Sequence, residues 1–175
     1  MTKPSLLAAL FGTVLSSASI ALAQAPSESD KHFVRDAIEG GNGEIQLGQL
    51  AQQKGTSDDV RKCGQKMVDD HTKLGEQMQS VAGHIGVTPS SGTSVSEKAL
   101  AAKLKLLSGD AFDKAYIKAM VEEHREDLQS FQKEATTGTN SEVREEAKRG
   151  AEVVQHHLQM AEQLARNHNV NVASK

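Results

Sequence analysis

Residues 67–71 read Met-Val-Asp-Asp-His, and residues 120–124 read Met-Val-Glu-Glu-His, so all five positions match in type. Each copy lies near the middle of a segment in which apolar residues recur every three or four positions, the spacing of an amphipathic helix. The repeat therefore predicts two corresponding helices that present the same histidine at the same height of a shared core.

Two more segments with this spacing flank the repeat, so the sequence predicts four long helices. Serine caps, early acidic residues and terminal glycines place their boundaries. Each helix has about 26 residues and a length of roughly 40 Å at about 1.5 Å per residue. Aromatic residues make up 3% of the chain, and this scarcity favours helices over a sheet. The expected ranges are 29–54, 57 to between 83 and 86, 110–137, and 141–168.

The connections between these helices are unequal in length. Short Gly/Ser/Thr/Asn turns join the first pair and the last pair, which predicts two antiparallel hairpins. Residues 86–109 separate the pairs and contain a Pro/Ser/Gly/Thr stretch followed by a short amphipathic segment, 97–107. A connection of that length can cross the whole bundle and leave the second and third helices parallel. The expected fold is all-α, a ferritin-like four-helix bundle with one long crossover.

The first 23 residues resemble an export signal. Lys3 precedes an uncharged apolar stretch that ends in Ala21-Leu22-Ala23, a small-x-small cleavage pattern, and a second such pattern allows cleavage after Ala25. We therefore expect a signal peptide over 1–23, and a periplasmic or secreted protein that does not insert into the membrane once the signal is cleaved. Residues 24–175 form one expected domain, with its core at about 29–168.

Charge and cysteine content exclude other classes. Loss of Lys3 leaves 19 Lys and Arg against 23 Asp and Glu, a net charge of −4, which gives no electrostatic footprint for nucleic acid. A single cysteine, Cys63, cannot form an internal disulfide. The fold must therefore rest on its core or on something bound in it.

One polar residue near mid-length interrupts the apolar face of each long helix. These residues are Glu44, His71, His124 and His157. Packed helices lie only about 8–10 Å apart, so four such side chains can converge. Imidazole nitrogens and a carboxylate suit borderline divalent metals such as Zn, Mn, Fe, Ni or Cu.

Met67 and Met120 lie on the same faces as two of the histidines, and thioethers beside imidazoles suit copper(I), so both are candidate accessory ligands. The same methionines also fit ordinary core filling. A Glu-x-x-His pair, usual in dinuclear sites of this topology, is absent because Val68, Val121 and Val154 occupy the acidic position. The alternative is that the four polar residues form a metal-free hydrogen-bonded network. His32, His84 and His156 are expected to face solvent, and Asp113 and His168 to lie where water reaches them.

Several motifs resemble the exported bacterial proteins of domain-of-unknown-function family 4142. They are Phe33…Gly40-Gly41-x-x-Glu44-x-x-Leu47-Gly48-x-Leu50-Ala51, Val60…Met67-Val68-x-Asp70-His71, Ser108-Gly109-x-x-Phe112-Asp113-x-x-Tyr116…Met120-x-x-x-His124, and His157-x-x-x-Ala161. The resemblance covers about residues 30–166, and Cys63-Gly64 departs from it. It implies a ferritin-like helical fold, export and the four polar core positions, and it brings no established reaction.

Two functions follow as hypotheses. The first is an exported metal-binding protein that acts in envelope metal or oxidative-stress handling. The second is a non-enzymatic structural or interaction module with a metal-free buried Glu/His network. The sequence leaves open the metal, any reaction, the protein partner, the oligomeric state and the role of Cys63.

Overall fold

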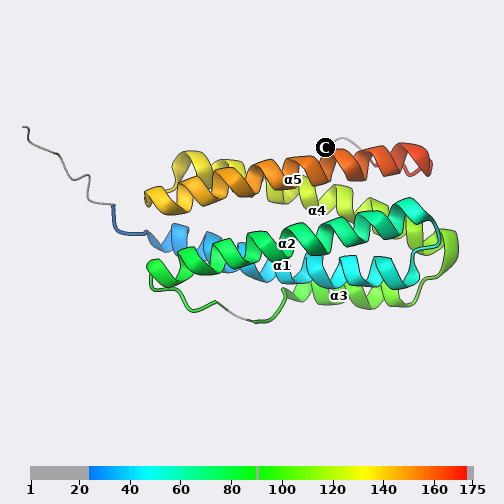
Figure 1. Ribbon diagram of the computed structural model, residues 1–175, viewed down its shortest axis with the longest axis horizontal. Coiled ribbons are helices and arrows are strands. Elements are labelled where there is room, and N and C mark those ends of the chain that lie inside the picture. The colour runs from blue at the N-terminus through cyan, green and yellow to red at the C-terminus, as the bar shows by residue number, and fades with distance from the viewer. Residues whose placement is uncertain (1–23, 90, 173–175) are drawn as a thin grey trace, which may run out of the picture.

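A computed structural model describes residues 24–89 and 91–172 of the protein. In these residues the fold is all-α, with five helices and no strand (Figure 1). The predicted export signal, residues 1–23, lies outside the described residues. The helices are α1 (Glu28–Lys54), α2 (Asp58–His84), α3 (Val95–Lys105), α4 (Gly109–Thr137) and α5 (Ser141–Asn167).

The helix boundaries agree with the predicted ranges to within two residues. Ser27 caps α1 in a capping box with Asp30, and Asn140 caps α5 by accepting hydrogen bonds from the backbone N–H groups of Glu142 and Val143. Ser57 stands at the N-cap of α2, but its side chain makes no capping hydrogen bond. A different group, described below, accepts its backbone N–H.

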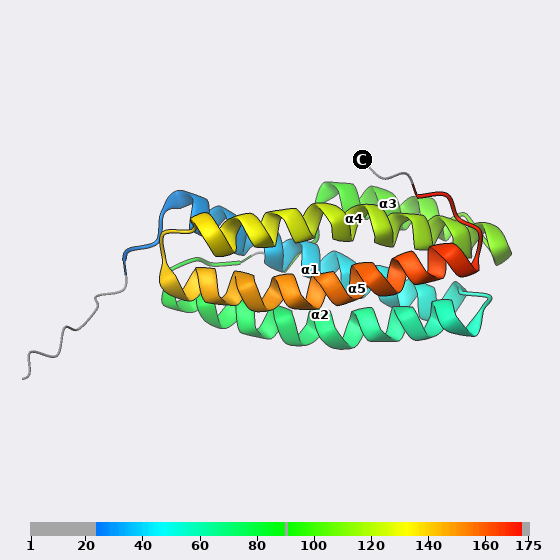
Figure 2. The ribbon, with the colours of Figure 1, turned by 90° about the horizontal axis from the view of Figure 1, so that it is seen from above.

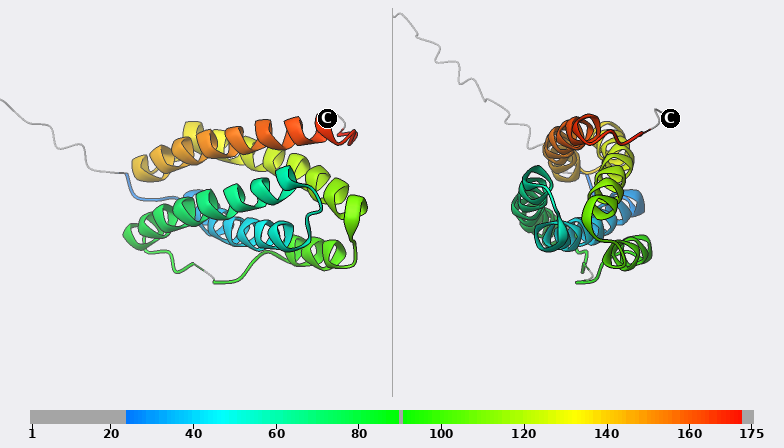
Figure 3. Two further views of the ribbon diagram at one scale, coloured as in Figure 1. Left: turned by 45° about the vertical axis from the view of Figure 1, so that its right-hand side comes forward. Right: turned by 90° about the vertical axis from the view of Figure 1, so that its right-hand side faces the viewer.

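The long connection does cross the bundle. After α2 the chain runs back along the outside of α1, forms α3 there, and enters α4 at the end where α2 began (Figures 1 and 2). Consequently α2 and α4 run in the same direction. Viewed along its length, the bundle has the four long helices around a common axis with α3 outside them (Figure 3). In this arrangement α1 packs on α2 and α4, and α5 packs on the same two helices.

The two hairpin turns repeat each other in sequence and in structure. Residues 55–61 read Gly-Thr-Ser-Asp-Asp-Val-Arg and residues 138–144 read Gly-Thr-Asn-Ser-Glu-Val-Arg, 83 positions later. The Arg61 guanidinium donates to the carbonyl oxygens of the first two residues of its turn, and Arg144 does the same in the second turn. The fold is thus a duplicated hairpin, in which α4 and α5 correspond to α1 and α2. The pentapeptides around the histidines do not reveal this repeat, because they lie on α2 and α4.

Each turn is held by an aspartate from the other hairpin. The Asp113 carboxylate on α4 accepts hydrogen bonds from the backbone N–H groups of Thr56 and Ser57 at 2.9 and 3.0 Å. Asp30 on α1, which precedes Asp113 by 83 positions, accepts hydrogen bonds from the N–H groups of Thr139 and Asn140 at 2.9 and 3.3 Å. The expectation that water reaches Asp113 is wrong: it is buried because it supplies the acceptor that the turn needs.

The core is divided along the bundle into two apolar clusters. One contains Met67, Phe112 and Tyr116 with their neighbours, and the other contains Phe33, Phe131 and further residues toward the opposite end. On each long helix, one buried polar residue separates the positions that belong to the two clusters. The predicted polar residues therefore form a layer at mid-bundle.

Candidate metal centre

The four predicted polar residues are all buried. Glu44 on α1, His71 on α2, His124 on α4 and His157 on α5 are 1%, 3%, 0% and 1% exposed. The other predicted positions also agree, because His32, His84 and His156 are exposed. The helical spacing therefore assigned the buried faces correctly.

Three of the four residues come together. His71, His124 and His157 each offer a ring nitrogen, and these nitrogens all lie within 4.8 Å of one another. Nδ1 of His157 is 3.3 Å from Nε2 of His71. A tetrahedral metal with bonds of about 2.0–2.1 Å holds its ligand atoms about 3.3 Å apart, so this pair already has the spacing of two metal ligands.

Asp70 orients His157 and was missed by the sequence reasoning about the site. Its Oδ2 is 2.8 Å from Nε2 of His157, on the ring edge opposite His71. Lys66 pairs with the same carboxylate at 2.6 Å. A ligand histidine ordinarily donates its second ring N–H to a carboxylate or carbonyl, which fixes its tautomer. The signal was present in the repeat, where an acidic residue precedes each histidine.

His124 is oriented by its own helix. Its Nδ1 lies 2.9 Å from the carbonyl oxygen of Met120. A carbonyl oxygen only accepts, so Nδ1 carries the proton and Nε2 keeps its lone pair. That Nε2 is buried and has no hydrogen-bond partner. It therefore meets the requirement for a metal ligand.

Glu44 lies beside the three histidines and not among them. Its Oε1 is 3.7 Å from Nδ1 of His124, and Glu44 is not in the group of donor atoms that lie within 4.8 Å of one another. Neither carboxylate oxygen of Glu44 has a hydrogen-bond partner. Burial and the nearby Glu123 raise the pKa of Glu44 well above its ordinary value.

The environment keeps the three imidazoles neutral. Burial lowers the pKa of His71 well below its ordinary value, with a further contribution from the other two histidines. Burial, followed by His157, lowers the pKa of His124 to about 3. Burial also lowers the pKa of His157, although Asp70 opposes the shift. Metals bind neutral imidazole, so this protonation state favours coordination over a wide pH range.

The candidate accessory ligands belong to the apolar core. Met67 and Met120 are 0% exposed and pack in the cluster that also contains Cys63 and Tyr116. Burial raises the pKa of the Cys63 thiol to about 12, so the thiol remains protonated at neutral pH. This surrounding fits core filling, and a ligand role for the two methionines stays a prediction.

A small cavity of about 60 Å³ reaches the centre from one side. Its lining includes His71, Gly41 and Asp127, together with apolar residues of α1, α4 and α5. A Cβ atom at Gly41 would lie 4.0 Å from Nδ1 of His71. The cavity has space for water, so a ligand of that size can approach His71.

Comparisons with known proteins bear on the fold. A family model described as "Domain of unknown function (DUF4142)" matches residues 15–164. The crystal structure of a DUF305 fragment from Deinococcus radiodurans superposes with a TM-score of 0.71 at 15% identity, covering 81% of this chain and 98% of that chain.

A DUF305 protein from Streptomyces coelicolor, described as a candidate secreted protein, gives a TM-score of 0.70 at 14% identity, covering 84% of this chain and 98% of that chain. At these identities the likeness concerns the fold alone. No protein with a curated description matches the chain. None of the helices in residues 24–89 and 91–172 has the length and apolar character needed to cross a bilayer.

Proposed function

Since the chain belongs to the DUF4142 family, a family of unknown function, we propose a role from the site itself: the protein binds a metal ion in its bundle core. The observation that carries this proposal is the group of three buried imidazoles, His71, His124 and His157, with donor nitrogens within 4.8 Å of one another. Three helices from both hairpins supply them, so the ion would also link the two halves of the fold.

The donor set favours a borderline divalent metal. Three neutral imidazoles suit Zn, Fe, Ni, Cu and Mn, in company with a water or a carboxylate as the fourth ligand. Glu44, 3.7 Å from Nδ1 of His124, is the predicted fourth ligand and would need a side-chain movement to join them. Copper(I) is the variant of this proposal in which Met67 or Met120 contributes a thioether.

The finer fold and the location belong to the same proposal. The parallel course of α2 and α4, joined by one crossover, supports a ferritin-like four-helix bundle. The charged start and small-residue cleavage pattern of residues 1–23 support export to the periplasm or the exterior. An exported metal protein would serve in envelope metal or oxidative-stress handling.

One observation favours the alternative, a structural module with a metal-free network. His157 already has a partner on each ring nitrogen, Asp70 at 2.8 Å and His71 at 3.3 Å. With Nε2–H donated to Asp70, Nδ1 of His157 can accept the N–H of His71. The same geometry thus serves a hydrogen-bond chain or a pair of metal ligands.

Thermal unfolding of the purified protein separates the two functions. After chelator treatment, Zn²⁺ at a hundredfold excess over its Kd should stabilise the native state by about 2.7 kcal/mol. His71→Ala and His124→Ala should abolish this gain, whereas His84→Ala, at an exposed position of α2, should retain it. If the first two variants lose the same stability with and without Zn²⁺, the metal proposal fails and the network remains.

A further inference from the structure

A second polar site lies between α1, α3 and α4; Glu44 belongs to its lining and no histidine does. It is a pocket of about 280 Å³, and seven of its ten lining residues are acidic. None of these ten residues is basic. So many carboxylates around one space repel one another unless protons or a cation neutralise them.

Three carboxylates in this pocket have buried oxygens without a hydrogen-bond partner. They are both oxygens of Glu44, Oε2 of Glu97 and Oε2 of Glu123. Glu44 is 1% exposed, and Glu97 is 9% exposed. A buried charged oxygen without a partner is costly, and native proteins pair such groups or use them to coordinate metals.

The backbone of α1 is shaped to admit one of these carboxylates. Glu97 projects from α3, the short helix of the crossover, and a Cβ atom at Gly43 would overlap its carboxylate. Gly40 leaves further space, because a Cβ atom there would be 3.9 Å from Oε1 of Glu97. The glycines of α1 therefore let the crossover helix deliver an acidic group to the core, although mid-helix glycine costs about 0.5–1 kcal/mol each.

We propose that Glu44, Glu97, Glu123 and Asp127 bind a hard divalent cation such as Mn²⁺ or Ca²⁺, at a site separate from the three histidines. Carboxylate oxygens are the ligands these ions prefer, and Ca²⁺ accepts six to eight of them in flexible geometry. Four carboxylates offer enough oxygens for most of that shell, and water entering the pocket would complete it. Their side chains would have to move toward the ion, because among the described residues only the three histidines form a group of three or more whose donor atoms all lie within 4.8 Å of one another.

The pKa values of the carboxyl groups in this pocket are raised, as expected where no positive charge stabilises their ionised forms. Burial, followed by the Glu123 charge, raises the pKa of Glu97 to about 8. Burial raises the pKa of Asp127 to about 6. A bound divalent ion would reverse this tendency by stabilising the ionised form of each group.

The site does not depend on the histidine centre. Glu97 and Asp127 are not among the donors grouped with the imidazoles, and α3 contributes nothing to that group. Glu44 stands between the two sites, and its predicted role as a ligand to the histidine-bound metal would be replaced by a role here. The two proposals can therefore fail separately.

Titration of the chelator-treated protein with Mn²⁺, with free Mn²⁺ followed by electron paramagnetic resonance, tests the site. We expect one Mn²⁺ per chain that Ca²⁺ displaces, in addition to any Mn²⁺ held by the histidines, and at least tenfold weaker binding of this ion in Glu97→Gln and Asp127→Asn. Both changes keep the side-chain shape, and circular dichroism checks that the helices remain. Glu122→Gln removes an exposed charge from α4 and should bind as the unchanged protein does.

His157→Ala should also bind Mn²⁺ unchanged, because it removes only the histidine centre. Absence of saturable binding, or equal affinity in Glu97→Gln and the unchanged protein, would overturn the proposal. Loss of binding in His157→Ala alone would assign the ion to the histidines and overturn it as well. Equal losses in Glu97→Gln and Glu122→Gln would show general charge attraction and no site.

Discussion

Gly64 is the position where the bundle should respond most clearly to a single methyl group. It lies on α2 where this helix crosses α1 at Gly48, and the two backbones touch reciprocally. A Cβ atom at Gly64 would lie 2.6 Å from the carbonyl oxygen of Gly48 and 2.8 Å from Cβ of Ala51. Ordinary contact begins near 3.4 Å, so Gly64→Ala must push α1 and α2 apart by several tenths of an ångström.

The magnitude follows from two opposing effects. Overpacking a core contact costs about 1–3 kcal/mol, and here the obstructing oxygen belongs to a backbone that cannot rotate away. Alanine in place of a helical glycine returns about 0.5–1 kcal/mol. We expect Gly64→Ala to lower the free energy of unfolding by ~1–2 kcal/mol. Gly75→Ala, one turn beyond His71 on the same helix and with nothing within 4 Å, should raise it by about 0.5–1 kcal/mol.

Urea unfolding and thermal unfolding, both followed by helix circular dichroism, measure the two variants. The melting temperature should fall by roughly 2–8 °C for Gly64→Ala and rise by roughly 1–4 °C for Gly75→Ala. An unchanged dependence on urea would confirm that both variants unfold from the same compact state. The reasoning would be refuted if Gly64→Ala were as stable as the unchanged protein, since the two helix backbones would then not be in contact.

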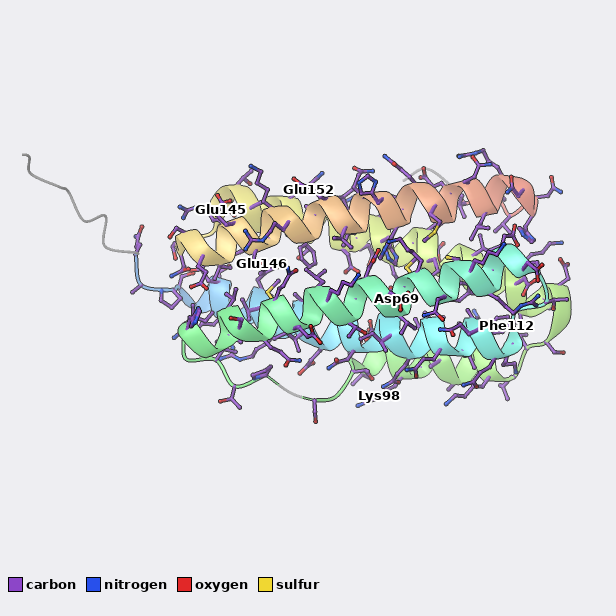
Figure 4. All side chains as sticks on the ribbon, viewed as in Figure 1. Asp69, Lys98, Phe112, Glu145, Glu146 and Glu152 are labelled. Atoms are coloured by element: carbon purple, nitrogen blue, oxygen red, sulfur yellow. The ribbon has the colours of Figure 1, made fainter. Side chains whose placement is uncertain are left out.

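Two further predictions concern the polar layer. Asp70→Asn should weaken metal binding at the histidines about 10–100-fold, measured in competition with a chelating dye, because the carboxylate that orients His157 is lost. Asp69→Asn, on the exposed face of α2 (Figure 4), should leave metal binding unchanged. Equal effects of the two substitutions would contradict an orienting role for Asp70. In the chelator-treated protein, the pKa of Glu97 in the folded state is about 8, against an ordinary value of 4.5. The contribution of Glu97 to the free energy of unfolding is therefore fully present below about pH 4.5 and is lost as the pH rises to 8. Between pH 6.5 and 8, Glu97→Gln should reduce the loss in free energy of unfolding by ~1 kcal/mol after allowance for solvent screening. If urea unfolding gave the same dependence of this free energy on pH for both proteins, the prediction would be contradicted.

The histidines contribute pH dependence of the opposite sign. Their folded-state pKa values lie below the ordinary 6.5, so the unfolded chain binds protons first as the pH falls. Stability from this source is complete above about pH 6.5 and decreases at lower pH. The window above pH 6.5 therefore isolates the carboxylates.

Helical spacing predicted the long helices, their boundaries and the four buried polar residues, because a single apolar stripe leaves little choice of inward face. The same reasoning missed Asp70, since its side chain reaches a neighbouring helix from beside the stripe and not from within it. It also placed Glu44 with the histidines, and Glu44 does lie beside them, with Oε1 3.7 Å from Nδ1 of His124. It did not reveal that Glu44 and Glu97 line one acidic pocket, because no spacing along α1 encodes where the crossover helix will lie. The partner of Asp70 and the surroundings of Glu44 depend on how the helices pack in three dimensions.

The reciprocal aspartates at the turns carry a consequence for how the chain assembles. Neither hairpin can satisfy its own turn, because the acceptor for each set of N–H groups is located on its counterpart. A hairpin that formed alone would leave the N–H groups of its turn without their acceptor, and its own aspartate, Asp30 or Asp113, without the donors of the other turn. Packing of the two hairpins thus completes the hydrogen bonds of both turns, and we expect the duplicated halves to unfold as one cooperative unit.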